Sequence, residues 1–182
     1  MSIILVKQLP SWPKQATGLT LSSNLYAGAA DRADVPINFI RAAPFWVPTT
    51  LTLDRIGIRV RGAGAGGSVA RVGIYTDNEN WYPASLIGEA AATIDGTSVA
   101  VQLLTVAYQL TRGVHWLAMT HDSDAMDISG PATAHFTFAN ESNGQFGWSV
   151  ATAYGALPST YPAGGAADAV VPLPYYRILS YP

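Results

Sequence analysis

The stretch Thr50-Leu51-Thr52-Leu53-Asp54-Arg55-Ile56-Gly57-Ile58-Arg59-Val60 decides the fold. Polar and apolar residues alternate from Thr50 to Leu53 and again from Ile56 to Val60. A period of two is that of a β-strand with one face on a core. The two runs are out of phase by one residue at Asp54-Arg55, and such a shift would turn one run away from the core. The sequence therefore predicts a bulge or a bend at Asp54-Arg55.

Short runs of β-forming residues, separated by turn residues, continue through the rest of the chain, and we find no helical stripe among them. Glycine, Asn, Asp and Ser predict a loop at 62–68 and turns at 77–80 and 95–98. Two prolines exclude 170–174 from a central strand. The predicted strands are 69–75, 85–94, 99–104, 113–119, 134–138, 146–150 and 175–179. This pattern is typical of an all-β fold, an antiparallel β-sandwich that is jelly-roll-like.

Charged residues are scarce in this chain. They make up 12% of the 182 residues, about half of the ~25% in average proteins. A monomer with so little charge has few solvated groups to cover its surface. We therefore expect a surface built partly of Ser, Thr, Asn, Gln and Gly, and partly buried against other chains.

The charge pattern excludes several classes of partner. Ten Lys and Arg stand against twelve Asp and Glu, which gives a formal net charge of −2, and the cations form no basic stripe along the sequence. Nucleic-acid binding and polybasic membrane attachment are therefore not expected. No apolar run is long enough to span a bilayer, so no membrane insertion is expected either. The absence of cysteine excludes disulfides and thiolate zinc sites.

The domain organisation divides the chain near residue 40. Residues 41–182 are predicted to form one β-sandwich domain, which suits their number. Residues 1–40 show little periodicity and are predicted to form an extended N-terminal arm or docking segment. Such an arm either docks onto a neighbouring chain or wraps its own domain, and the sequence leaves both alternatives open.

Several segments, taken in order, resemble a domain of tailed-bacteriophage virion structural proteins of the fibre, spike and decoration type. The segments are 24–26, 43–48, 53–60, 70–75, 77–78, 83–87, 110, 113, 116–118, 154–158 and 161–164. The resemblance covers about residues 24 to 180. It implies a jelly-roll-like sandwich on the virion exterior, usually oligomeric, without catalytic residues. No long shaft is expected, which favours a short spike, a knob or a head or tail decoration role.

An acidic segment is the candidate metal site. Asp122, Asp124 and Asp127 place oxygen ligands within six residues, a composition that suits calcium. The glycine and glutamate of an EF-hand loop are absent, so that motif is excluded. A solvated turn is the favoured interpretation over a calcium site, and we expect no other cofactor.

Aromatic residues in or beside loops form the candidate binding site. Flat rings there stack on sugars or on partner chains, whereas core packing is the expectation for Trp46 and Trp116. The candidate binding residues are Trp81, Tyr82, Trp148, Tyr154 and Tyr161. They support the alternative function, a carbohydrate-binding module that recognises a host surface polysaccharide.

No catalytic constellation stands out in the sequence. It has no Gly-x-Ser-x-Gly elbow, no supported carboxylate pair and no phosphate-binding loop. His115 is expected to face opposite Trp116 on a strand and to be structural. The sequence therefore predicts a protein that is not an enzyme. We expect a virion component, made in the host cytoplasm, that forms a homotrimer or larger assembly and docks onto other virion proteins.

Overall fold

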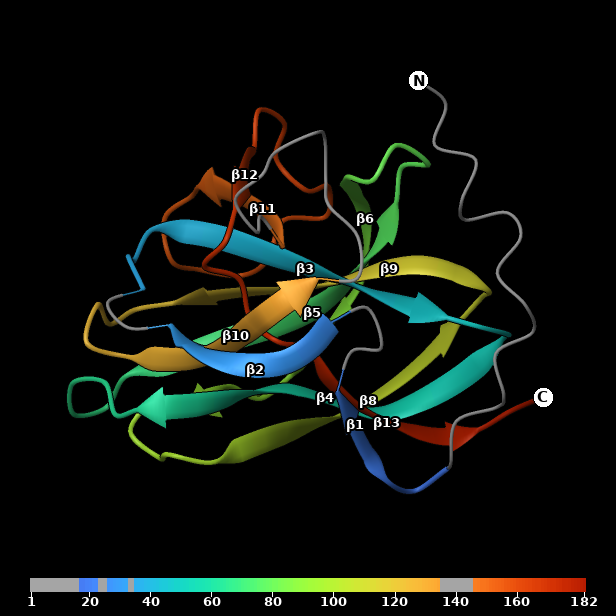
Figure 1. Ribbon diagram of the computed structural model, residues 1–182, viewed down its shortest axis with the longest axis horizontal. Helices are drawn as coiled ribbons and strands as arrows, with labels where there is room; N and C mark the ends of the chain where they lie inside the picture. Colours follow the sequence, from blue (N-terminus) through green and yellow to red (C-terminus); the bar gives the residue numbers. More distant parts are fainter. Residues whose placement is uncertain (1–16, 23–25, 33–34, 135–145) are drawn as a thin grey trace.

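The computed structural model describes residues 17–22, 26–32, 35–134 and 146–182, and it confirms the predicted fold class (Figure 1). Within those ranges the regular elements are all strands, and they form two antiparallel sheets that pack against each other. None of the described residues belongs to a helix with the length and apolarity to cross a bilayer. The protein is an antiparallel β-sandwich.

The first sheet is organised around the long strand β4. On one side β4 pairs with β8, and on the other it pairs with β13 and then with β10. The outer strands β1 and β2 pair with β13 and β10, respectively. Its strands are β1 (Thr20–Ser22), β13 (Tyr175–Ser180), β4 (Leu51–Gly62), β10 (Asp127–Ala134), β2 (Tyr26–Arg32) and β8 (Val101–Leu110).

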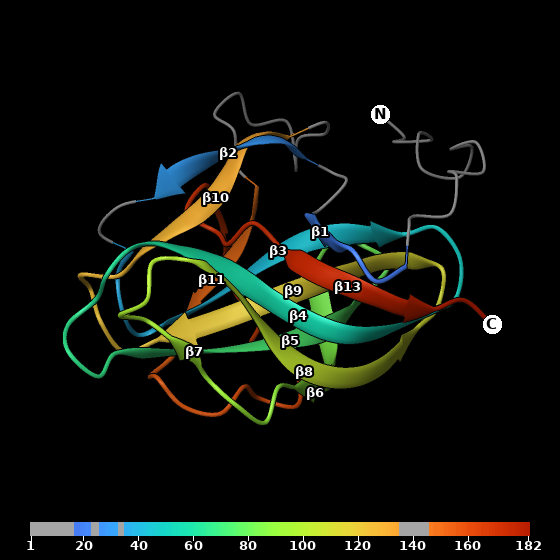
Figure 2. The same ribbon diagram turned by 90° about the horizontal axis from the view of Figure 1, so that it is seen from below.

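The second sheet has β9 and its neighbours β3 and β5 at its centre. Its order is β12-β11-β3-β9-β5-β6, and β7 pairs with β5. The strands are β12 (Ala166–Asp168), β11 (Gly147–Ala151), β3 (Phe39–Val47), β9 (Gly113–His121), β5 (Val69–Asp77), β6 (Pro83–Glu89) and β7 (Ile94–Asp95). The chain changes sheet repeatedly, for example at β3–β4, β4–β5, β8–β9 and β9–β10, as in a jelly roll. Figure 2 looks onto β13, β4 and β8, with the second sheet behind them.

The predicted irregularity in β4 is present. The register of β4 shifts between Leu53 and Arg55 against β8, and it also shifts against β13 at Arg177/Ile178. The bulge restores the phase of the strand, because apolar residues on both sides of it are buried in one core. These residues are Leu51, Leu53, Ile56, Ile58 and Val60.

The main core lies between the two sheets. It contains alternate residues of the central strands, such as Val72 and Ile74 of β5, which the sequence predicted to share a face. Phe45 of β3 packs on Tyr176 of β13, with ring centroids 5.2 Å apart, so this contact joins the two sheets. Each fully buried aliphatic side chain contributes about 1.5–3 kcal/mol.

Two strands that the sequence did not predict contain proline. Pro44 lies in β3 opposite Trp116, beyond the reach of β11, which pairs only with residues 39–42. Pro131 lies in β10 opposite Ala29, beyond the pairing with β4. Among the described strands, no second partner reaches either strand at its proline, so the missing N–H interrupts no ladder bond between described strands.

The remaining strand predictions agree with the structure in most places. The predicted strands 69–75, 113–119, 146–150 and 175–179 correspond to β5, β9, β11 and β13. The prediction of one strand over 85–94 is wrong, because β6 ends at Glu89 and β7 begins only at Ile94. Of the predicted strand 134–138, residues 135–138 lie outside the described residues.

Part of the predicted N-terminal arm contributes strands to the sandwich. β1 and β2 pair in cis with β13 and β10, and β3 crosses the predicted boundary at residue 41. Residues 1–16, 23–25 and 33–34 of the predicted arm lie outside the described residues, so its docking role stays a prediction.

Candidate functional site

Four of the five candidate binding residues gather on the outer face of the second sheet. Tyr75 and Trp116 are buried there, on the face opposite to Val72 and Ile74. Loops from two distant parts of the chain cover them. We define the aromatic cluster as Tyr75, Trp81, Tyr82, Trp148 and Tyr161.

The rings of the aromatic cluster pack mainly edge to face. Tyr161 meets Tyr75 at 5.4 Å and 88°, and it meets Tyr82 at 5.6 Å and 82°. Tyr82 is tilted on Trp148 at 5.2 Å. These are the favourable arrangements for aromatic pairs, each worth about 0.5–1.5 kcal/mol beyond burial. Tyr161 is only 3% exposed, whereas Trp81, Tyr82 and Trp148 are half-buried.

The polar atoms of the aromatic cluster bond the backbone of neighbouring segments. The Tyr161 hydroxyl lies 3.1 Å from both the Ile40 and the Trp148 carbonyl oxygens. The Tyr82 hydroxyl donates to the Pro162 carbonyl at 2.6 Å and accepts from the Gly165 N–H at 3.0 Å. These bonds tie the 152–165 loop to the outer face of the sheet.

Burial raises the pKa of the Tyr161 and Tyr75 hydroxyls well above their ordinary value. Neighbouring tyrosines add to the effect at Tyr161, and the charge of Glu89 adds to it at Tyr75. Both hydroxyls are therefore neutral at physiological pH. They contribute to the site as hydrogen-bonding groups.

The turn 77–80 is confirmed and carries Trp81. Asp77 Oδ2 accepts from the Glu79 N–H at 2.7 Å, and Asp77 Oδ1 accepts from the Trp116 indole at 2.8 Å. Glu79 and Trp81 both have left-handed backbone, with φ of 70° and 59°. A non-glycine residue costs about 1–3 kcal/mol in a sparsely populated conformation. The Trp148 indole donates to the Trp81 carbonyl at 2.6 Å and so helps to hold this strained turn.

Tyr154 lies apart from the aromatic cluster. Burial raises the pKa of its hydroxyl, and the charge of Asp122 adds to that effect. A side-chain hydrogen bond with Arg71 opposes it. Arg71 also pairs with Glu89, whose second oxygen accepts from the Leu157 N–H at 2.9 Å. The structure therefore places Tyr154 in a polar contact group beside β5 and not in an aromatic site.

The side chains of the three candidate metal ligands contact different segments of the backbone. Asp122 Oδ1 accepts from the Val69 N–H at 2.8 Å, and Asp124 Oδ1 accepts from the Ile37 N–H at 2.7 Å. The Asp127 side chain lies beside Gly62. Across the described ranges, no three His, Cys, Asp or Glu side chains gather closely enough to hold a metal ion.

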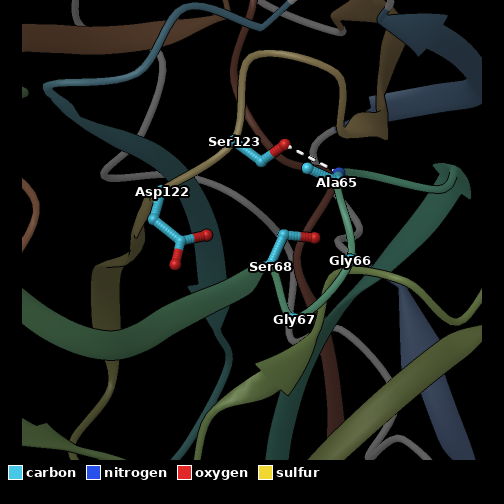
Figure 3. Close-up of a pocket in the computed structure, with 6 residues that line it drawn as sticks. All are labelled: Ala65, Gly66, Gly67, Ser68, Asp122 and Ser123. Carbon is cyan, nitrogen blue, oxygen red and sulfur yellow. Dashed lines mark hydrogen bonds between the residues drawn. The ribbon is translucent and has the colours of Figure 1, made fainter.

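A shallow hollow lies between the β4–β5 loop and the β9–β10 loop (Figure 3). It is lined by Ala65, Gly66, Gly67, Ser68, Asp122 and Ser123. Ser123 Oγ accepts from the Ala65 N–H at 3.0 Å, so this serine bridges the two loops. Of the predicted calcium ligands, only Asp122 lines the hollow.

Buried polar residues between the sheets were missed by the sequence analysis. Arg41 is 3% exposed. Its Nε lies 3.5 Å from Asp168 Oδ2, and its Nη1 donates to the Pro36 carbonyl at 2.8 Å. His121 is 1% exposed, and its Nδ1 lies 3.0 Å from the Ser123 carbonyl oxygen. Burial lowers the pKa of both groups, and the charge of Arg41 lowers that of His121 further. The one signal in the sequence is a lone cation inside the apolar run 39–47.

Comparison with known proteins adds no family to this description. A search of protein-family models and a search of curated proteins found no match to the chain.

Proposed function

We propose that this chain is a structural protein of a tailed-bacteriophage virion that acts by assembling with copies of itself and with other virion proteins. The observation that carries the proposal is a charge-poor surface that exposes aliphatic side chains. Only 12% of the residues are charged. Leu19, Val99, Val101 and Leu179 are between 41% and 59% exposed. Covering side chains of this kind with another chain lowers the free energy of the assembly.

The resemblance to virion proteins supports the same proposal. Its segments 43–48, 53–60, 70–75 and 116–118 fall on β3, β4, β5 and β9, the central strands of both sheets. Its segments 154–158 and 161–164 belong to the loop that closes over the aromatic cluster. The motifs thus describe one folded unit.

The test is incorporation into particles. Phage particles from a producing culture are purified on a density gradient, and an antibody against this chain is used to probe the particle and soluble fractions. The proposal expects the chain to sediment with intact particles after high-salt washing. A chain that remains entirely in the soluble fraction would overturn it.

A second candidate, glycan binding, is favoured by one observation at Trp81. This residue is half-buried, and it is held with φ of 59° beside the exposed polar residues Asn78, Glu79 and Asn80. Strained backbone that presents a ring beside polar groups is a feature of binding loops. If this candidate is correct, Trp81→Ala lowers affinity for host polysaccharide at least tenfold while the fold is kept. Trp46→Phe, at a buried position, serves as the control. Equal affinity of parent and Trp81→Ala would remove the basis for glycan binding.

A further inference from the structure

Strand β8 forms one edge of the first sheet. The first part of β8 forms the lower left border of the molecule in Figure 1, and its second part passes behind β4. Among the described residues it pairs with β4 alone. Its sequence from Val101 to Leu110 contains no charged residue and no proline. Long edge strands in natural proteins usually carry such residues, because an open edge is a template for another strand.

The other described edges are short, covered or charged. β1 and β12 have three residues each, and β7 has two. The outer side of β6 is covered, because the Leu86 N–H donates to Ser159 and the Tyr161 N–H donates to Ala84. β2 carries Asp31 and Arg32. Within the described chain, β8 is the edge strand that is both long and uncharged.

The register identifies which residues of β8 face outward. The Val60 N–H donates to the Ala100 carbonyl at 2.9 Å, so 60 and 100 are a hydrogen-bonded pair. Such pairs alternate along an antiparallel ladder. Residues 102 and 104 therefore direct their backbone groups toward β4, in register with Ile58 and Ile56. The backbone groups of Val101, Leu103 and Thr105 point away from β4, toward the open side.

We propose that β8 pairs with β8 of a second copy, antiparallel and about a two-fold axis at Leu103. In this register Leu103 faces Leu103 of the partner subunit, and Val101 faces the partner's Thr105. All three residues have outward backbone groups, so each opposed pair is a hydrogen-bonded pair. The inference rests on the proposed assembly function and specifies its contact.

A second copy of this chain is the partner that fits β8, because strand pairing needs two open edges. Strand pairing requires a free edge on both chains, and β8 is the described edge that offers one. A two-fold contact uses the same patch on both copies, so β8 can supply both edges. The pairing would also cover Val101, which is 41% exposed.

Charge also permits two copies of β8 to approach each other. The nearest cations on the outer face of this sheet are Arg55 and Arg59 of β4, which pair with Thr105 and Val101. In the paired sheet, the two copies of β4 are separated by three strand spacings, about 14 Å. That distance exceeds the Debye length of about 8 Å at physiological salt, so the arginines of the two copies barely repel each other.

The smallest assembly that this contact allows is a dimer. It differs from the homotrimer expected from the sequence, because an isologous contact brings chains together in pairs. Any larger assembly that repeats it in every subunit has an even number of chains.

Cysteine cross-linking tests the register directly, because the chain has no cysteine. Opposed Cα atoms of a hydrogen-bonded pair are about 5.5 Å apart, within the range of a disulfide. Leu103→Cys is expected to give a covalent dimer on mild oxidation. Ala151→Cys is the control, because residue 151 is exposed on β11 of the second sheet and takes no part in the proposed contact. Equal cross-linking of the two variants would overturn the proposed register.

A pair of double variants tests the contact without a cross-link. V101E/T105E places like charges opposite each other twice in the dimer, while each new carboxylate stays next to an arginine of its own chain. We expect the dimer to dissociate roughly 2- to 30-fold more readily. V101E/T105K places opposite charges at the same positions and keeps the dimer. Circular dichroism checks that both variants fold.

The outcomes separate the contact from the proposed function. If the parent assembles but both double variants assemble equally well, the β8 contact is wrong and the assembly function stands. If V101E/T105E weakens the dimer and V101E/T105K keeps it, but the chain does not sediment with particles, the contact stands and the virion function is wrong. A parent that remains monomeric at every concentration overturns the contact.

Discussion

Replacing Tyr161 tests whether the aromatic cluster is a structural element of the sandwich. Its side chain is 3% exposed and meets two other tyrosine rings edge to face. Tyr161→Ala removes that ring from a buried position, and large-to-small substitutions of aromatic residues cost about 3–5 kcal/mol. Tyr161→Phe keeps the ring and removes the hydroxyl that lies 3.1 Å from two carbonyl oxygens. Its expected cost is about 0.5–1.5 kcal/mol.

The assay is urea denaturation followed by tryptophan fluorescence, combined with a thermal melt. For a domain of this size, 1 kcal/mol shifts the melting temperature by about 2–4 °C. Leu19→Ala is the control, because Leu19 is 59% exposed and its loss is expected to change the free energy of unfolding by less than about 0.5 kcal/mol. If Tyr161→Ala unfolded within about 1 kcal/mol of the parent, the aromatic cluster would not support the fold as argued.

Three further predictions concern the pairing of β4 with β8, acid stability and calcium binding. Gly57→Ala is expected to destabilise the protein by about 1–3 kcal/mol, because a Cβ at residue 57 would lie 1.8 Å from the Gln102 carbonyl oxygen. Gly66→Ala, with no atom within 4 Å of its Cβ, should melt like the parent. Burial lowers the folded-state pKa of His115 and His121 below the usual 6.5. As the pH falls, these histidines therefore bind protons more readily in the unfolded chain than in the folded one. The free energy of unfolding is therefore expected to fall as the pH drops below about 6.5. The loss is expected to be smaller for His121→Gln. A urea midpoint that is unchanged between about pH 8 and pH 5 would contradict this prediction. Calcium and EDTA are expected to leave the melting temperature unchanged, and a calcium-dependent rise abolished by Asp122→Asn would restore the calcium hypothesis.

Alternation in the sequence was sufficient to predict much of the sandwich. It located β5, β9 and β13, and the phase change at Asp54-Arg55 located the bulge in β4. It failed for β3 and β10, because Pro44 and Pro131 indicate turns when strand neighbours are unknown. The strands tolerate both prolines because, among the described strands, only one neighbour pairs with each strand at that point.

The candidate site depends on contacts that no local pattern contains. Loop aromatics were identified by type, but Tyr82 and Tyr161 meet only because two loops cover the same face of the sheet. The same reasoning grouped Tyr154 with them, and the structure places it elsewhere. The open edge of β8 follows from strand order, which single-sequence periodicity does not give.

The solution mass of the purified protein, measured by light scattering coupled to size exclusion over a range of concentrations, tests assembly through β8 most directly. Pairing through β8 predicts a mass of twice the 19.2 kDa of one chain, or a larger even multiple, that decreases for V101E/T105E and not for V101E/T105K. A mass of 19.2 kDa for the parent at every concentration would contradict assembly through β8.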